Sequence, residues 1–130
     1  MRLLVCGATY FTDYKFLHDE LVRILTNRGY NLTPFAGQFT PIDITIISGM
    51  AKGADTLAVK FAEHYGLPCL KFPADWARYG KGAGPVRNQQ MLDEGKPDLI
   101  IAFPMQSSRG TRDMIKRGLM EDVPVIVIEV

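Results

Sequence analysis

The sequence predicts an α/β fold in which a five-stranded, mainly parallel β-sheet is covered by helices on both faces, giving three layers. Two observations predict this fold. Short apolar runs alternate along the chain with segments whose apolar residues recur at helical spacing. The runs are apolar at consecutive positions, which is typical of strands buried on both faces of a parallel sheet. The 130 residues, 47% hydrophobic and 22% charged, suit one globular domain covering residues 1–130.

Strands are predicted where a short apolar run ends at a glycine, a proline or a polar turn residue. The first run, RLLVC, ends at Gly7, and the last run closes the chain. In chain order, the predicted strands are residues 2–6, 43–48, 67–72, 98–103 and 124–130. The pattern does not give the order of the strands in the sheet, but it predicts a switch point between two of them.

Helices are predicted from apolar residues at helical spacing together with start and stop signals. The first covers 14–28, because Thr12 or Asp13 can accept hydrogen bonds at its start and Gly29 ends it. Further helices are predicted over 57–65, 85–94 and 112–121. Residues 31–42, with two prolines and a glycine, and the glycine-rich residues 73–84 are expected to be loops.

Composition excludes several classes of protein. Fifteen basic and fourteen acidic residues give a net charge of +1, which argues against holding duplex DNA by bulk charge. No apolar run approaches the roughly 20 residues of a membrane span, and the N-terminus lacks the apolar core of a secretion signal. We therefore expect a cytoplasmic protein without a membrane partner.

The cysteines and histidines are given no chemical role. Cys6 and Cys69 lie in apolar runs and are expected to be buried, reduced thiols. Without a nearby histidine they do not make a zinc site, so no metal is expected. His18 and His64 fall in predicted helices, at positions consistent with solvated faces.

Glycines, hydroxyls and cations gather directly after the predicted strands. In a parallel sheet all strands end at the same edge, and ligands bind there at the switch point. The expected ligand-binding residues are Gly7, Thr9, Ser48, Gly49, Lys52, Gly53, Asp55, Asp75, Trp76, Arg87, Asn88, Arg109, Gly110 and Thr111.

Two strand-to-helix junctions, at residues 49–53 and 107–111, have the composition of anion sites. Glycine lets the backbone approach a ligand, and the free N–H groups of the following helix point at the same place. Arg87 and Arg109 can bind phosphate through two hydrogen bonds each, and Trp76 and Tyr79 can stack on a base. These junctions can hold two anionic groups or the two ends of a dinucleotide-like molecule.

Each residue also has a purely structural interpretation. A glycine at such a junction is usually a turn residue, and Asp55 caps a helix or binds a ribose. Trp76 packs on its own loop or on a ligand, and Lys52 and Lys81 are ordinary solvated charges or phosphate contacts. The functional interpretation depends on the clustering at one edge.

Standard catalytic and phosphate motifs are absent from the sequence. There is no G-x-x-x-x-G-K-[ST], and no G-x-G-x-x-G follows the first strand, which disfavours a kinase, a P-loop ATPase or a conventional NAD dehydrogenase. No Ser–His–Asp set can be assembled, because both histidines fall in helices away from the clustered edge. Asp75 and Asp113 are candidate acid/base residues near that edge, besides Asp55.

Three stretches, ISGMAKGADTLA, FPADWARYGKGAGPVRNQQMLDEGKPDLIIAFP and SSRGTRDMI, resemble the SLOG superfamily. The most similar branch is the small stand-alone YspA/YAcAr-like domain found in bacteria and phages. The resemblance implies a Rossmann-like sheet and a pocket for a nucleotide or a nucleotide-derived ligand similar to ADP-ribose or NAD. The branch usually has Gly-Gly-Arg-Asp-Phe-Thr-Asp after the first strand, whereas this chain has Thr9 and Tyr10 in place of the Arg-Asp pair.

Two related branches imply further functions. The Lonely-Guy phosphoribohydrolases carry Pro-Gly-Gly-x-Gly-Thr-x-x-Glu; here Gly110 and Thr111 match, but Met114 takes the glutamate position. The DNA-processing protein A branch binds single-stranded DNA and carries Ser-Gly-x-Ala-x-Gly-x-Asp, which residues 48–55 match.

The leading hypothesis is therefore a sensor or sequestering domain for a small nucleotide ligand, with no other cofactor expected. The first alternative is a nucleotide N-glycosidase with Asp75 or Asp113 as acid/base. The second is single-stranded DNA binding, and nucleic acid is the less favoured partner. Because relatives often pair, the resemblance leaves homodimerisation open.

Overall fold

The computed structural model describes residues 1–32, 42–106 and 108–130, so most of the predicted loop at 31–42, residues 33–41, lies outside the described residues. Within them, five parallel strands form one sheet in the order β3-β2-β1-β4-β5. The strands are β1 (Arg2–Gly7), β2 (Thr45–Ser48), β3 (Cys69–Lys71), β4 (Leu99–Phe103) and β5 (Val125–Val127). The predicted α/β fold is confirmed, and the switch point lies between β1 and β4.

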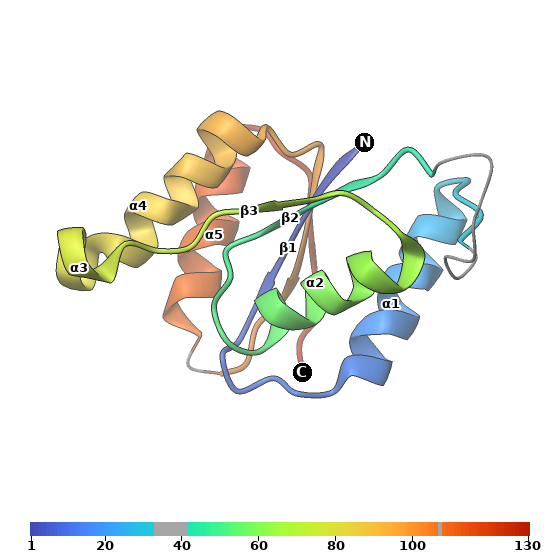
Figure 1. Cartoon of the computed structure of the whole chain (residues 1–130), viewed down its shortest axis with the longest axis horizontal. Coiled ribbons are helices and arrows are strands. Elements are labelled where there is room, and N and C mark those ends of the chain that lie inside the picture. Colours follow the sequence, from blue (N-terminus) through green and yellow to red (C-terminus); the bar gives the residue numbers. More distant parts are fainter. Residues whose placement is uncertain (33–41, 107) are drawn as a thin grey trace.

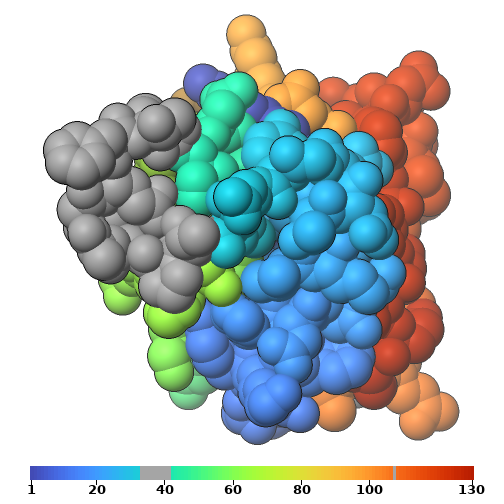
Figure 2. All heavy atoms as spheres, turned by 90° about the vertical axis from the view of Figure 1, so that its right-hand side faces the viewer, coloured from blue at the N-terminus to red at the C-terminus, as the bar shows by residue number. Residues whose placement is uncertain are grey.

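Helices cover both faces of this sheet, as the doubly apolar strands predicted (Figure 1). The helices are α1 (Tyr14–Asn27), α2 (Ala54–Tyr65), α3 (Trp76–Tyr79), α4 (Ala83–Gln90) and α5 (Arg109–Met120). A 3₁₀ turn (Gly80–Gly82) joins α3 to α4, and a π-helical turn (Met91–Gly95) extends α4. Helices α1 and α2 lie on one face, and α4 and α5 on the other. In the space-filling view α1 occupies the middle of one side of the molecule, and the C-terminal part of the chain lies along its edge (Figure 2).

Alternate residues of the strands divide the core into two clusters. Leu3 and Val5 of β1 pack against α1 and α2, whereas Leu4 and Cys6 pack toward α4 and α5. Burying one such side chain contributes about 1.5–3 kcal/mol, so the two-sided burial of the strands is what fixes the layers. The register pairs Leu3 with both Ile46 and Leu99, which places the carboxyl ends of β1 and β4 side by side.

The prediction of a loop over residues 73–84 was wrong. Asp75 caps α3 by accepting a hydrogen bond from the amide of Arg78 (3.1 Å), and the 3₁₀ turn then leads into α4 at Ala83. Pro85 therefore lies in the first turn of α4, where a missing N–H costs nothing. The glycines suggested a loop, but caps and short-range hydrogen bonds make the segment helical.

The helices otherwise follow the predictions, with differences at their ends. Asp13 caps α1 by accepting from the amide of Phe16 at 3.1 Å, as predicted. Helix α5 begins at Arg109, three residues before the predicted 112, because Ser108 already occupies the N-cap position.

The histidine and cysteine predictions have mixed outcomes. His18 is not on a solvated face: Nε2 lies 2.6 Å from the Tyr65 hydroxyl and Nδ1 lies 2.9 Å from Asp19. His64 is exposed, as predicted. Cys6 and Cys69 are both free; the first is buried and the second half-buried. Among the described helices, none is both long and apolar enough to cross a membrane.

Candidate functional site

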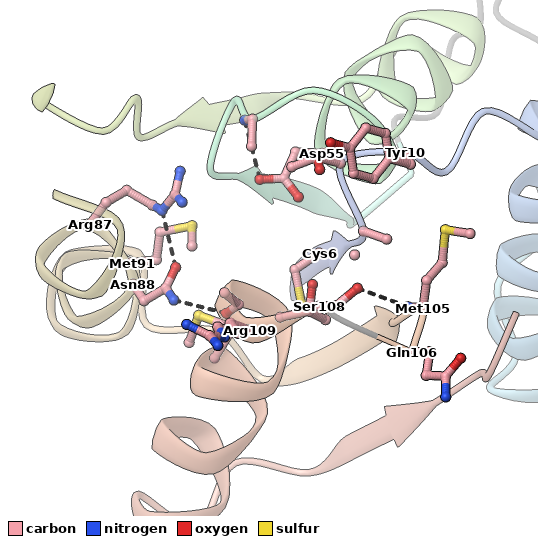
Figure 3. A pocket seen from close by; sticks show the side chains of 17 residues that line it. Cys6, Tyr10, Asp55, Arg87, Asn88, Met91, Met105, Gln106, Ser108 and Arg109 are labelled. Carbon is pink, nitrogen blue, oxygen red and sulfur yellow. Dashed lines mark hydrogen bonds between the residues drawn. The ribbon is translucent and has the colours of Figure 1, made fainter. Parts of the chain in front are cut away.

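A pocket of about 320 Å³ lies at the carboxyl ends of β1 and β4, at the switch point of the sheet. Four parts of the chain form its walls: the end of β1 with the loop after it, the start of α2, the middle of α4, and the approach to α5 with its first turns (Figure 3). Ligands of open α/β sheets bind at this location, because the chain leaves neighbouring strands toward opposite faces and opens a crevice.

Eight of the predicted binding residues line this pocket: Gly7, Thr9, Asp55, Arg87, Asn88, Arg109, Gly110 and Thr111. The openings of α2 and α5 therefore reach one and the same pocket. Ser107, which belonged to the second predicted junction, lies outside the described residues.

Asp55 is a buried carboxylate in the pocket wall. It is 5% exposed and is the second residue of α2, and its Oδ2 accepts a hydrogen bond from the amide of Ala51 at 3.3 Å. Burial raises its pKa to about 6, while Arg87 and the amides of Ala51 and Gly7 act in the opposite direction. Asp55 thus satisfies a backbone amide before its helix and also presents a group to the pocket that exchanges a proton near neutral pH.

Arg87 brings a buried positive charge to the same pocket. It is 9% exposed; its Nε donates to Asn88 Oδ1 at 3.0 Å and its Nη1 donates to the carbonyl of Gly49. Within the described residues, Nη2 has no protein acceptor, and no ion pair to Asp55 forms within 4.0 Å. Because a guanidinium in a pocket wall can bind phosphate through two hydrogen bonds, this arginine is suited to an anionic ligand.

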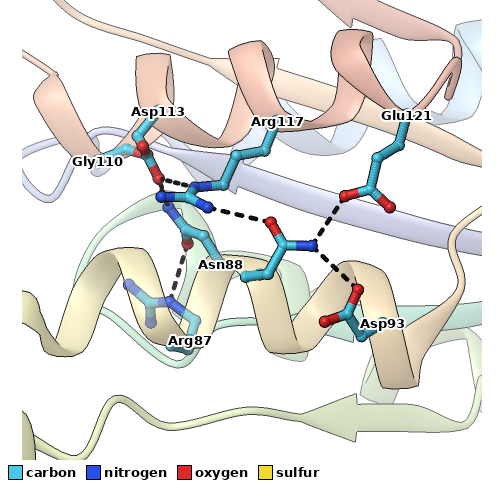
Figure 4. Close-up of polar contacts among 8 residues, drawn as sticks. Arg87, Asn88, Asp93, Gly110, Asp113, Arg117 and Glu121 are labelled. Carbon is cyan, nitrogen blue, oxygen red and sulfur yellow. Dashed lines mark hydrogen bonds and ion pairs between the residues drawn. The ribbon is translucent and has the colours of Figure 1, made fainter.

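Asn88 connects Arg87 to the opening of α5 (Figure 4). Its Nδ2 donates to the carbonyl of Gly110 (3.2 Å) and to Asp113 Oδ2 (2.9 Å), and Asp113 also accepts from Arg117 Nε at 2.8 Å. These contacts hold α4 and α5 at a fixed separation. They also place Asp113 in the helix interface and not among the residues that line the pocket.

The glycines of the segment 48–55 make room for the protein's own groups. A Cβ on Gly49 would lie 2.7 Å from Arg87 Nη1 and 2.8 Å from Asp55 Oδ2. A Cβ on Gly53, where φ is +80°, would collide with the carbonyl oxygen of Ala8. Neither glycine lines the pocket. Both allow the close packing that positions Asp55 and Arg87.

Ser48 and Lys52 of this segment also lie outside the pocket lining, whereas Ala51 and Asp55 belong to it. Ser48 is fully buried; its hydroxyl donates to the carbonyl of Asp55 at 2.8 Å and accepts from the amide of Met50 at 3.2 Å. Lys52 is exposed and does not line the pocket. Within the segment SGMAKGAD, Ser48, Gly49 and Gly53 therefore position the backbone and Asp55, while Ala51 and Asp55 themselves line the pocket.

Asp75 and Trp76 lie away from the pocket. Asp75 is the exposed cap of α3, and Trp76 is 60% exposed on the same short helix, at one end of the molecule (Figure 1). Neither lines the pocket. The two acids predicted as acid/base residues, Asp75 and Asp113, are thus both outside the lining, whereas Asp55 is within it.

Sequence reasoning missed several apolar lining residues. Cys6, Ala8, Tyr10, Met91, Met105 and Met114 all contribute to the walls. Tyr10 adjoins the predicted residue Thr9 and follows the same strand, so its position was a usable signal. Burial raises the pKa of the Cys6 thiol, with Asp55 adding to the effect and Arg87 opposing it, so this thiol is neutral and not a thiolate nucleophile.

Comparisons with known proteins give two matches. The family model described as "YspA, cpYpsA-related SLOG family" matches residues 1–79. The Gene 61 protein of Mycobacterium phage D29 is 30% identical, over 96% of this chain and 94% of its own length. No solved structure gives a significant match.

Proposed function

Because the chain belongs to the YspA, cpYpsA-related SLOG family, we propose that it binds a nucleotide or nucleotide-derived ligand, of the ADP-ribose or NAD type, and senses or sequesters it. One observation carries the proposal: two helix openings and a buried arginine line the same pocket at the switch point. Free N–H groups at a helix start and a guanidinium both favour phosphate. The pocket volume of about 320 Å³ suits one nucleotide unit of such a ligand, since small-molecule pockets span roughly 300–1,000 Å³.

In this proposal the phosphate lies against the first turn of α5. Among the described atoms, none stands within 4 Å of the place that a Cβ on Gly110 would occupy, so a ligand can approach the backbone there. Arg87 contributes charge from the buried wall, and Arg109 contributes it from the exposed rim. Asp55, on the wall formed by α2, accepts a hydrogen bond from a ribose hydroxyl.

One observation favours a second candidate function, hydrolysis of the N-glycosidic bond of a nucleotide. Asp55 is a pocket carboxyl whose pKa is raised to about 6, which suits a general acid near neutral pH. In that reaction the protonated Asp55 gives its proton to the departing base as the C1′–N bond breaks; water then adds to C1′, and the proton that this water loses returns to the Asp55 carboxylate. The products are ribose 5-phosphate and the free base. Asp55 replaces Asp75 and Asp113 in this role, because it is the acid among the lining residues.

A matched pair of arginines on α5 tests the binding proposal. Arg109 and Arg112 are both exposed, but only Arg109 belongs to the pocket lining. Isothermal titration with AMP, ADP-ribose and NAD is expected to show binding that weakens at least several-fold in Arg109→Gln and is unchanged in Arg112→Gln. Equal effects of the two variants, or no binding of any of the three compounds to the unmodified protein, would contradict the proposal.

The same protein preparations separate binding from turnover and from nucleic-acid binding. Chromatography of AMP after long incubation detects free adenine if the protein is a hydrolase, and Asp55→Asn is then expected to abolish its release. A salt titration supplies the second distinction. Affinity for a small ligand depends weakly on salt, whereas affinity for a single strand falls steeply because many phosphates are neutralised together.

A further inference from the structure

Tyr10 is a pocket residue that projects almost entirely into solvent. It lines the pocket and is 84% exposed, the highest value among the exposed large hydrophobic side chains of the described chain. Such exposure of an aromatic ring has no packing benefit for the protein alone. A ligand can therefore stack on the ring without breaking packing contacts within the protein.

The backbone around Tyr10 is anchored on both sides. Ala8 is buried, donates to the carbonyl of Phe103 at 3.0 Å and accepts from the amides of Phe11 and Ala54 at 3.2 and 3.3 Å. Phe11 is 6% exposed and stacks on Phe103, with ring centroids 5.6 Å apart. The exposed ring thus stands on a two-residue turn between fixed points, which reduces the entropy lost when a ligand stacks on it.

The pocket has a basic side and an aromatic side. Figure 3 places Arg87 and Asn88 on one side of the pocket and Tyr10 and Met105 on the other, with the Asp55 carboxylate next to Tyr10. The small or apolar residues Cys6 and Ala8 also line the pocket. A ligand that matches this division carries an anionic group at one end and a flat, apolar-faced ring at the other.

We propose that Tyr10 recognises the base of the nucleotide by stacking on it while the phosphate lies at Arg87 and the opening of α5. This inference rests on the proposed function and deepens it, because it names the ligand class as a base-bearing nucleotide and excludes a bare sugar phosphate. Aromatic side chains bind every nucleobase through its π-face, so Tyr10 supplies affinity for a base without selecting one.

The test compares two probes, AMP and ribose 5-phosphate, which share the phosphate and differ in the base. Tyr10→Ala is expected to weaken AMP binding roughly 5- to 150-fold, the range for loss of one base–aromatic stack, and to leave ribose 5-phosphate binding unchanged. Tyr10→Phe keeps the ring and is expected to bind AMP within about twofold of the unmodified protein. Trp76→Ala removes an exposed aromatic outside the pocket and serves as the matched control.

A fluorescent variant reports the stacking directly. Trp76 is the single tryptophan of the chain, so Tyr10→Trp in a Trp76→Phe background places the only tryptophan at the pocket. AMP is expected to quench its emission, and ribose 5-phosphate is not. A merely structural role for Tyr10 would produce no such difference between the two probes.

The outcomes distinguish this inference from the proposed function. If the unmodified protein binds AMP and ribose 5-phosphate equally, or if Tyr10→Ala weakens both probes alike, the role of Tyr10 is refuted while nucleotide binding stands. If the unmodified protein binds neither probe but binds ADP-ribose or NAD, the role assigned to Tyr10 in AMP binding is refuted while the proposed function stands; if ADP-ribose and NAD also fail to bind, both are refuted together. Because Tyr10 is exposed, its variants are expected to fold normally, and thermal unfolding of each variant checks this.

Discussion

Replacing Asp55 by Asn is expected to remove a pH-dependent loss of stability that the native carboxyl imposes. Burial raises the pKa of Asp55 from 3.8 to about 6. Between these two values the folded state binds more protons than the unfolded state, so the free energy of unfolding falls as the pH rises. The stabilising preference for the protonated form is fully present below about pH 4 and is lost once the pH exceeds about 6.

The shift fixes the size of the effect. Two pKa units correspond to about 3 kcal/mol, because one unit is about 1.4 kcal/mol of differential interaction. Asparagine is neutral at every pH and has nearly the same shape. The difference in unfolding free energy, variant minus native, is therefore expected to increase by about 3 kcal/mol between roughly pH 3.5 and pH 7.5. Its value at any single pH also contains the altered hydrogen bond to Ala51, so the change with pH is the informative quantity.

Urea unfolding of both proteins at several pH values measures this difference. The m-value, which is the slope of the free energy of unfolding against urea concentration, must be equal for the two proteins at each pH. Equal m-values show that the two proteins expose the same surface on unfolding. All other titrating groups are shared and cancel in the difference. A difference that stays constant within about 0.5 kcal/mol over this range would refute the assignment of a raised pKa to Asp55, and with it the general-acid alternative.

Three further substitutions test the packing around the site. Gly53→Ala is expected to lower the free energy of unfolding by about 2 kcal/mol or more, because φ is +80° and the new Cβ would meet the backbone of Ala8 and Thr9. Gly82→Ala is the control: φ is −81° and the space around the new Cβ is open, so the variant is expected to be neutral or slightly stabilised. Urea unfolding compares the two variants. Gly118→Ala places a Cβ 2.4 Å from Ile100 Cδ1, so we expect a loss of about 1–3 kcal/mol that Ile100→Val, which removes that methyl group, partly restores in a double-mutant cycle. Asn88→Ala leaves the buried Arg87 Nε without its acceptor and removes the hydrogen bonds to Gly110 and Asp113. It is expected to cost about 1–3 kcal/mol and to weaken AMP binding, whereas an unchanged melting temperature and affinity would show that the α4–α5 contacts are dispensable.

The sequence predicted the layers of the fold well, because a strand that is buried on both faces is apolar at consecutive positions. Leu3 to Cys6 are apolar at every position, and the structure buries them alternately under helices of opposite faces. The order of the strands left no such mark, since it depends on which apolar edges meet in three dimensions. The helical turn at Trp76 was missed because its cap is a local hydrogen bond from the amide of Arg78 to the Asp75 carboxylate, and glycines nearby suggested a loop.

The edge of the sheet that carries the site was also predictable, but the direction of each side chain was not. The sequence alone does not distinguish a glycine that leaves space for a ligand from a glycine that leaves space for other atoms of the protein. Gly49 and Gly53 belong to the second kind, as the positions of Arg87 and Ala8 show. Tyr10 was overlooked as a pocket residue because a single exposed aromatic has no periodic pattern.

The two buried charged residues at the pocket, Arg87 and Asp55, are the residues whose energetic cost a bound ligand would offset most. Arg87 and Asp55 are both at least nine-tenths buried, yet among the described contacts they do not form an ion pair, and burial keeps the pKa of the carboxyl near 6. Two charges held in this way cost stability, and natural proteins keep such costs mainly where function requires them. A phosphate beside Arg87 would balance its charge and accept hydrogen bonds from the guanidinium N–H groups, those of Nη2 among them, that have no acceptor among the described residues. Binding of an anionic nucleotide should therefore raise the melting temperature, because it offsets the cost of the buried Arg87 charge in addition to making contacts of its own.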